Sequence, residues 1–283
     1  MRSVADVLVR RLAAAGVNTI FGVPGGGGNL DLIAAAGRAG LRFVLTATET
    51  AGAIAAIAQA EITGRPGACL STLGPGVASI VNGVACASLD RAPLIVFADA
   101  PPASASAFTH QRVDHHALLA PVSKWSATLT PETADVVMAT AVARTLAHPR
   151  GPVHIDCPAD VLGQAAHGDH ADVAPAGALA TGERAGQVRQ VWQVTEGRRV
   201  DALLASARRP LLLVGVGARD RDAATAVREL CASHDVDALV TYKAKGVVSD
   251  RDPHFAGVFT NGLADSGLRL IRSSEAVGGW RRR

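Results

Sequence analysis

The segment from Phe43 to Gly76 constrains the fold most, because two β-type runs flank a helical run of small residues. Phe43–Thr48 is rich in β-formers and predicts a buried strand, Thr50–Thr63 predicts a helix, and Ala68–Leu73 predicts a second strand. Strand–helix–strand units of this length build parallel sheets. Ligands bind such sheets at the carboxyl ends of the strands, so the residues that follow these strands are the first candidates for a site.

The alternation of strand and helix patterns continues on both sides of this segment. Further helices are predicted at Val4–Ala15, Leu32–Ala39, Val77–Leu89 and Ala134–Ala147, and strands at Thr19–Val23, Leu41–Thr48, Pro93–Ala98 and Pro152–Cys157. Asn29 or Asp31 is expected to cap the second helix, and Thr130 or Thr133 the last. Pro121–Leu129 has no regular pattern. The prediction is an α/β fold with a doubly wound parallel sheet.

A second unit follows a change in composition. Residues 164–189 are rich in Ala, Gly, His and Asp without a period and predict a linker between domain 1–163 and domain 190–283. The second domain is predicted to contain helix Val200–Ala207, strand Pro210–Val214, helix Ala223–His234 and strand Ala238–Thr241. The pattern then decays, and the terminal residues 273–283 predict neither a capped helix nor a closing strand. We expect an incomplete Rossmann-like α/β domain.

Composition excludes several classes of protein. The 283 residues are enough for two domains of about 100–200 residues each. The net charge of +3 is small and dispersed, which argues against a nucleic-acid surface. No apolar run reaches the roughly 18 residues of a membrane span, and the N-terminal segment is an amphipathic helix rather than a signal peptide. The four cysteines have neither CxxC nor metal spacing, so we expect reduced core residues in a cytoplasmic protein.

Glu49 stands where the first strand gives way to the helix of small residues, and two interpretations fit it. Thr46 and Glu49 have the spacing of a capping box, in which the glutamate bonds the backbone of the cap residue. Alternatively, the carboxylate faces a ligand at the strand end. Burial in a tight subunit contact would raise the pKa of the acid there, and the nearby helix N-terminus would lower it. With the two effects in balance, the acid could share a proton with a ring nitrogen of the ligand.

Two glycine loops follow predicted strands. Gly25–Gly28 resembles a dinucleotide loop, but no GxGxxG register fits, because Leu30 and Asp31 stand where a glycine is required, and no Walker sequence follows. This loop is either a tight turn or a close approach of backbone to a flat ligand. Gly74-Pro75-Gly76 is either a plain turn or a stiff loop whose amides point at the ligand-binding edge.

A polar loop follows the strand Pro93–Ala98. It contains His110, Gln111, Asp114, His115 and His116. HxxxxHH is not a known metal-ligand spacing and no cysteine joins it. A polar lid over a site, or a solvated loop, is therefore favoured over a metal site, and no metal ligand is predicted.

The order of these motifs is more specific than any one of them. FGVPGG at Phe21–Gly26 precedes TETAGAIAAIAQA around Glu49, then STLGPG at Ser71–Gly76, PLIVFADAP at Pro93–Pro101 and GPVHIDCPADV at Gly151–Val161. This order resembles the N-terminal, pyrimidine-binding domain of thiamine-diphosphate enzymes, in the group of acetolactate synthase, benzaldehyde lyase and benzoylformate decarboxylase. The second unit resembles the start of the central domain of that family. The resemblance covers residues 1–262.

The resemblance implies catalytic roles for Glu49 and Gln111. In the family, the glutamate holds a ring nitrogen of the aminopyrimidine and so assists formation of the C2 ylide, and the glutamine points at the reacting carbon. The implied contacts to thiamine diphosphate are made by Pro24, Gly25, Glu49, Ser71, Thr72, Gly74, Pro75 and Gly76. The implied activity is decarboxylation or carboligation of 2-keto acids or aldehydes, as a lyase or transferase, in a dimer or tetramer of identical chains.

Departures from the family pattern bear on which activity is expected of this chain. Ser79 stands where many relatives have an Asn. His110-Gln111-Arg112 stands where they often have Phe-Gln-Glu, and this second change favours a lyase or decarboxylase over acetolactate synthase itself. The Gly-Asp-Gly…Asn motif for Mg²⁺ and diphosphate is missing, since Gly168-Asp169 continues as His170.

We therefore expect a truncated chain that is inactive alone, with Mg²⁺ bound through the missing domain. The sequence does not decide whether FAD binds. The alternatives are a subunit completed by a separate diphosphate-binding chain, or a non-catalytic oligomerisation or binding protein.

Overall fold

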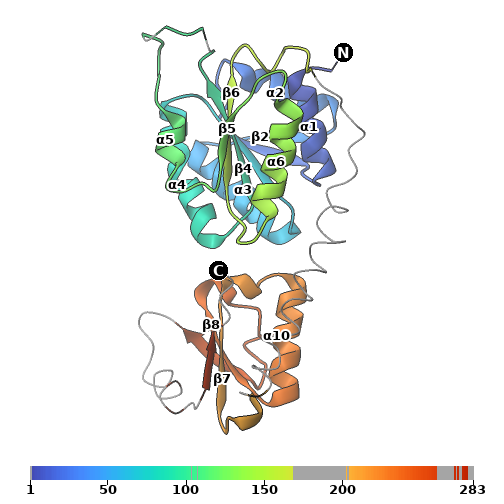
Figure 1. Cartoon of the computed structure of the whole chain (residues 1–283), viewed down its shortest axis with the longest axis vertical. Coiled ribbons are helices and arrows are strands. Elements are labelled where there is room, and N and C mark those ends of the chain that lie inside the picture. The colour runs from blue at the N-terminus through green and yellow to red at the C-terminus, as the bar shows by residue number, and fades with distance from the viewer. Residues whose placement is uncertain are drawn as a thin grey trace. The chain divides into compact units, whose positions relative to one another are not determined.

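The computed structural model describes residues 2–102, 104–106, 108–167, 202, 204–259, 271, 273 and 276–279. The chain divides into two compact units, residues 1–179 and 180–283, which Figure 1 shows. The domain bounds expected at residues 163 and 190 stay predictions, because most of the expected linker and part of the helix expected at 200–207 lie outside the described residues.

Within the described part of the first unit, six parallel strands form one sheet in the order β2-β1-β3-β4-β6-β5. The strands are β1 (Thr19–Gly22), β2 (Arg42–Leu45), β3 (Gly67–Ser71), β4 (Leu94–Ala100), β5 (Ser126–Thr128) and β6 (Val153–Pro158). Strands β3, β4 and β6 are buried along their whole length. Strands with both faces buried are expected when helices cover both sides of a parallel sheet.

The helices pack on both faces of this sheet. They are α1 (Val4–Ala14), α2 (Gly28–Arg38), α3 (Glu49–Thr63), α4 (Pro75–Asp90), α5 (His115–Leu119) and α6 (Ala134–Leu146). One apolar core joins α1, α2 and α6 to the sheet, and a second core joins α3, α4 and the end of α5 to the opposite face (Figure 1). The prediction of a doubly wound parallel sheet is confirmed.

Small residues bring α3 close to its neighbours. A Cβ on Gly52 of α3 would lie 2.8 Å from the α-carbon of Gly22 in β1. A Cβ on Gly83 of α4 would lie 2.4 Å from the Cβ of Ala53. The hydroxyl of Thr50 donates to the carbonyl of Ser79 at 2.5 Å. Much of the small-residue surface of α3 is therefore used inside the first unit, where it allows close backbone packing.

Three local predictions for this unit are wrong. Phe43–Thr48 was expected to be buried, but β2 is an edge strand and Leu45 is 67% exposed. The segment without pattern contains the short edge strand β5. Neither Asn29 nor Asp31 caps α2, because the helix starts at Gly28. Thr133 is the N-cap residue of α6, as one of the two expected candidates, although its side chain makes no capping bond to that helix.

The second unit contains a smaller parallel sheet. Its described strands are β7 (Pro210–Val214), β8 (Asp237–Thr241), β9 (Phe255–Phe259) and β10 (Ala276–Gly279), in the order β10-β7-β8-β9. They alternate with α10 (Arg221–His234) and the short 3-10 helices η1 (Val216–Ala218) and η2 (Tyr242–Ala244). The expectation that the chain end forms no strand is wrong, since β10 pairs with β7.

Two further sequence expectations concern the whole chain. All four cysteines have free thiols, and Cys69, Cys157 and Cys231 are buried, as expected for core residues. Among the described helices, none combines the length and the apolar character that crossing a bilayer requires.

Candidate functional site

The carboxyl edge of the six-stranded sheet brings the predicted site residues together. Gly25 follows β1, Glu49 follows β2, and Thr72 begins the loop after β3. A Cβ on Gly76 would lie 2.5 Å from Thr72 Cγ2 and 3.3 Å from Glu49 Oε1, and a Cβ on Gly25 would lie 2.5 Å from Thr72 Oγ1. These glycines keep the backbone of two loops against the side chains of Thr72 and Glu49, with no room for a β-carbon.

Glu49 is the first residue of α3, and its carboxylate does not cap that helix. The N-cap is Thr48, whose hydroxyl oxygen accepts from the backbone N–H of Ala51 at 3.1 Å. The hydroxyl of Thr46 donates to the carbonyl of Thr48 at 2.8 Å. The capping box of Thr46 and Glu49 is therefore wrong. The Glu49 side chain is half-buried, and no hydrogen bond or ion pair joins it to another described residue.

The Gly74-Pro75-Gly76 loop opens α4 and is held from two sides. Proline at the first position of α4 suits a helix start, and Gly74 has φ +58°. Its N–H donates to Nε2 of His115 at 2.9 Å. A Cβ on Gly74 would lie 2.1 Å from the carbonyl oxygen of Gln111. The loop is thus fixed by a buried histidine and by the backbone of the segment that follows β4.

Gln111 lies over the glycine–proline–glycine loop with its side chain exposed. Its φ is +58°, a left-handed conformation that costs a residue other than glycine roughly 1 kcal/mol. The neighbouring Arg112 donates to the carbonyl of Ser106 at 3.1 Å and closes the turn. A strained residue at the rim of a candidate site is consistent with the predicted role of Gln111.

Asp99 is a functional candidate that the sequence analysis missed. It lies at the end of β4, fully buried, and its Oδ1 accepts from the N–H of Asn29 at 2.8 Å. The backbone N–H of Gly27 also faces this carboxylate. The carboxylate thereby caps α2 from across the sheet, which explains why Gly27 suffices at the cap position. An aspartate inside the apolar run PLIVFADA was the signal in the sequence.

The other oxygen of Asp99 has no partner. Oδ2 is buried without a hydrogen bond in the described part of the chain, and a Cβ on Gly25 would lie 2.2 Å from it. Burial raises the pKa of Asp99 to about 6, against the lowering effect of the Asn29 and Gly27 amides. Asn29 also donates from Nδ2 to the carbonyl of Ser71 at 2.8 Å, so the two glycine loops are joined through one buried polar group.

The histidine-rich loop is divided between surface and core. Gln111 and Asp114 are exposed, and Asp114 caps α5 by accepting from the N–H of Ala117 at 2.9 Å. His115 is buried, and its Nδ1 lies 2.7 Å from Asp156 Oδ1 in β6. His154 Nε2 lies 3.1 Å from the same oxygen. The loop, for which a polar lid or a solvated loop was expected, is therefore anchored by a buried polar cluster.

The atoms of His115, His154 and Asp156 are close enough to surround a metal ion. The hydrogen bonds of His115 argue against that use. Its Nε2 already accepts the Gly74 N–H, so Nδ1 carries the ring proton and donates it to Asp156. A metal ligand needs a free lone pair, and His115 has none left. The expectation that this loop holds no metal site stays a prediction.

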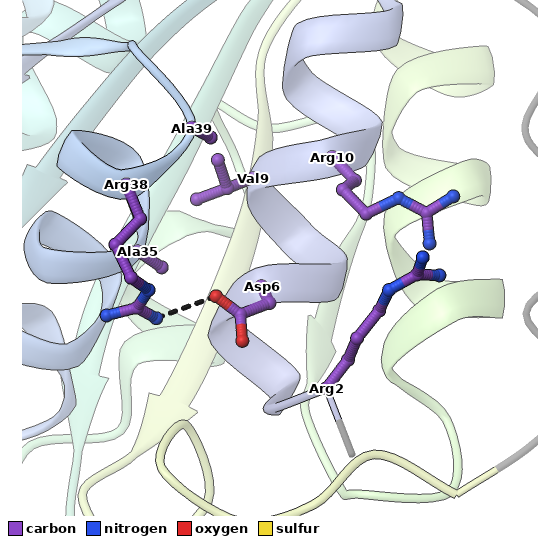
Figure 2. A pocket seen from close by; sticks show the side chains of 7 residues that line it. All are labelled: Arg2, Asp6, Val9, Arg10, Ala35, Arg38 and Ala39. Atoms are coloured by element: carbon purple, nitrogen blue, oxygen red, sulfur yellow. Dashed lines mark hydrogen bonds and ion pairs between the residues drawn. The ribbon is translucent and has the colours of Figure 1, made fainter.

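A shallow depression lies elsewhere on the first unit, between α1 and α2 (Figure 2). Arg2, Asp6, Val9, Arg10, Ala35, Arg38 and Ala39 line it. Arg38 extends from α2 to Asp6 of α1, and the ion pair measures 2.6 Å (Figure 2). None of the predicted site residues borders this depression. We assign it no part in the site.

Two domain families match the chain. Residues 2–118 match the thiamine pyrophosphate enzyme N-terminal TPP binding domain, and residues 198–277 match the thiamine pyrophosphate enzyme central domain. The chain therefore belongs to the thiamine pyrophosphate enzyme family and contains its N-terminal and central domains. The predicted recognition is confirmed, and Glu49, Thr72 and the Gly74-Pro75-Gly76 loop all lie inside the N-terminal match.

Individual relatives agree with the family. The chain is 33% identical to the acetolactate synthase isozyme 2 large subunit of Escherichia coli, over 90% of this chain and 44% of the relative. It is 34% identical to the probable 2-ketoarginine decarboxylase AruI of Pseudomonas aeruginosa, over 75% and 37%, and 28% identical to the pyruvate oxidase of Lactiplantibacillus plantarum, over 88% and 40%. The chain thus spans about two fifths of the length of these curated relatives.

Proposed function

We propose that this chain supplies the pyrimidine-binding half of a thiamine-diphosphate site, with Glu49 as the acid that holds a ring nitrogen of the cofactor. The observation that carries the proposal is the Glu49 carboxylate itself. It stands at the start of α3, half-buried beside the α-carbon of Gly76, and without a partner among the described residues. A carboxylate in that position is available to a ligand instead of being used by the fold.

The surroundings of Glu49 suit a flat ring. Pro24, Gly25, Gly74, Pro75 and Gly76 present backbone without large side chains at the sheet edge. Thr72 lies between the two loops, in reach of both Gly25 and Gly76.

Ser71 contributes differently from the other wall residues. It is fully buried, and its hydroxyl donates to the carbonyl of Thr72 at 3.1 Å. We therefore propose that Ser71 forms part of the wall of the site and that its hydroxyl does not contact the cofactor.

The residues of this chain have separable roles in the proposed reaction. When bound, thiamine diphosphate supplies a nucleophilic carbon and accepts the electrons that decarboxylation releases. Glu49 holds and exchanges a proton at the ring nitrogen that faces it. Gln111, on the loop over Gly74, orients the group on the reacting carbon. The Gly25 and Gly76 loops position the ring and exclude water from one of its faces.

The proposed reaction class is decarboxylation or carboligation of 2-keto acids or aldehydes. Two of the relatives are named as an acetolactate synthase and a probable 2-ketoarginine decarboxylase, which supports this class. Contacts to Mg²⁺ and the diphosphate are proposed to come from a further domain or from another chain. FAD is left out of the proposal, because none of the described contacts favours it.

An oligomer is part of the proposal. The exposed residues of α3 include Ile54, 42% exposed, and Ile62, 86% exposed, and Leu45 of the edge strand β2 is exposed as well. Gathered exposed apolar side chains mark a protein contact, and we propose that these residues take part in one. The same surface favours the second candidate, a non-catalytic oligomerisation protein, and cofactor binding distinguishes the two.

Calorimetry tests the proposal. The chain is titrated with 4-amino-5-hydroxymethyl-2-methylpyrimidine, which is the ring without diphosphate, and with thiamine diphosphate plus Mg²⁺. Glu49→Gln is expected to weaken binding of the ring about tenfold or more, corresponding to about 1.4 kcal/mol or more. Glu61→Gln, at the far end of the same helix, is the matched control and should bind as the parent chain does. Equal heats for the parent chain and Glu49→Gln would remove Glu49 from the site.

A further inference from the structure

We propose that His115 is a positioning residue of the cofactor site: as a neutral imidazole it holds the Gly74-Pro75-Gly76 loop beside Glu49, and protonation of its ring releases that loop. This inference rests on the proposed function for its consequence, but the hydrogen bonds that carry it belong to the fold.

Both ring nitrogens of His115 are committed to partners from other elements. Nε2 lies 2.9 Å from the backbone nitrogen of Gly74, which can only donate, so Nε2 carries the lone pair. Nδ1 lies 2.7 Å from Oδ1 of Asp156 and therefore carries the proton. His115 is 3% exposed and Gly74 is buried, so water does not replace either bond without a movement of the chain.

The protonation states of the groups that face His115 decide which proton can affect its hydrogen bond to Gly74. Burial alone would raise the pKa of the Asp156 carboxyl in β6, but the hydrogen bond from His115 and the nearby His154 ring hold that pKa well below the usual range, so Asp156 stays ionised. Burial lowers the pKa of His154, also on β6, so that ring stays neutral. His116 is 42% exposed, and its Nε2 lies 3.3 Å from Asp156 Oδ2. The contacts of His116 are to Thr128 and Asp156 and not to Gly74.

A proton on Nε2 of His115 would replace an acceptor by a donor opposite the Gly74 N–H. The bond at 2.9 Å would be lost, and the two N–H groups would repel each other. A Cβ on Gly74 would meet the carbonyl of Gln111, and two residues later a Cβ on Gly76 would lie 3.3 Å from Glu49 Oε1. The displaced loop would therefore open the wall next to Glu49, and binding of the aminopyrimidine would weaken as the pH falls.

Glutamine at position 115 provides a non-titrating replacement. Its amide oxygen can accept from Gly74 and its amide nitrogen can donate to Asp156, so it offers the same two functions without a charge change. His116→Gln is the matched control on the neighbouring residue. His115→Ala removes both hydrogen bonds, and His115→Gln keeps the test valid if the alanine variant does not fold.

The test follows the Gly74 amide by hydrogen exchange and nitrogen NMR of the full chain, from about pH 8 to about pH 5.5, where histidine titrates. Protection of Gly74 is expected to fall with pH in the parent chain and in His116→Gln, in step with the His115 ring signal, and to stay constant in His115→Gln. Constant protection in the parent chain, or a His115 ring with its proton on Nε2 at pH 8, would overturn the proposal.

Aminopyrimidine binding provides the second measurement. Affinity is expected to fall about tenfold over the same pH range in the parent chain and to change little in His115→Gln. If the Gly74 protection of the parent chain depends on pH but the chain binds no aminopyrimidine at any pH, the proposed function is overturned. The inference that His115 holds Gly74 by a hydrogen bond would still hold. Equal pH dependence of binding in the parent chain and His115→Gln would overturn the positioning role of His115.

Discussion

The Oε1 atom of Glu49 lies 3.3 Å from the point that a Cβ on Gly76 would occupy. The first turn of α3 and the first turn of α4 therefore meet at the sheet edge with only hydrogen atoms of a glycine between them. This contact keeps the Glu49 carboxylate beside a backbone surface, and it makes the site sensitive to a single methyl group.

Gly76→Ala is expected to reduce aminopyrimidine affinity about tenfold or more. The new methyl group would clash with Thr72, 2.5 Å from Cγ2, and press on Glu49, and overpacking of this kind costs roughly 1–3 kcal/mol of stability. Gly26→Ala, whose methyl group would have no neighbour within 4 Å, is the control. Calorimetry and a denaturation curve measure both effects. Unchanged binding in Gly76→Ala would show that the ring does not approach this loop.

Gly83→Ala is expected to destabilise the first unit by roughly 1–3 kcal/mol. The methyl group would lie 2.4 Å from the Cβ of Ala53, and this clash outweighs the gain of about 1 kcal/mol in helix propensity. Gly37→Ala in α2 has open space around the new methyl group and should stabilise by about 0.5–1 kcal/mol. Urea midpoints report both values. A stabilised Gly83→Ala variant would contradict the tight crossing of α3 and α4.

In Asp99→Asn, the free energy of unfolding is expected to fall less between acidic and neutral pH than in the parent chain. In the folded chain, burial raises the pKa of Asp99 to about 6, above its ordinary value. The protonated carboxyl therefore contributes fully to the free energy of unfolding at low pH, and this contribution is lost as the pH rises through about 6. An asparagine keeps the acceptor for the Asn29 and Gly27 amides and does not ionise.

The measurement for Asp99 is the free energy of unfolding at about pH 4.5 and about pH 7.5. The fall between these values should be smaller in Asp99→Asn by roughly 2 kcal/mol, with Asp31→Asn at the exposed start of α2 as the control. An identical fall in the parent chain and Asp99→Asn would show that Asp99 is ionised and solvated.

His154→Leu is expected to make the fold less sensitive to acid. His154 is fully buried in β6, and neither ring nitrogen has a hydrogen bond in the described part of the chain. Burial lowers the pKa of His154 in the folded chain. The folded chain therefore has its full free energy of unfolding above about pH 6.5 and loses part of it as the pH falls below that value. Leucine fills a similar volume without a proton site.

Thermal unfolding across pH measures the effect of His154→Leu. The variant should match or exceed the parent chain near neutral pH and lose less stability on acidification. A steeper acid loss in His154→Leu would mean that the ring is charged and paired with Asp156 in the folded chain, 3.1 Å away.

Strands and helices of both units were predictable where they repeat a local pattern. β7 (Pro210–Val214) matches its prediction to the residue, and α3 (Glu49–Thr63) differs by one. Burial was less predictable, since the apolar residues of Phe43–Thr48 form an edge strand and not a central one. Strands as short as β5, or with glycines as in β10, carry too little pattern to be found, and pairing with a neighbour defines them.

By itself, the sequence determined the order of strands and helices, and therefore that Glu49 and both glycine loops lie at the carboxyl edge of a parallel sheet. Periodicity and turn chemistry act over a few residues and can be read locally. Only the tertiary structure decided the long-range partners: Asp99 caps α2, and His115 holds Gly74. Those bonds join residues that are adjacent only after the sheet has assembled, because packing and not spacing brings them together.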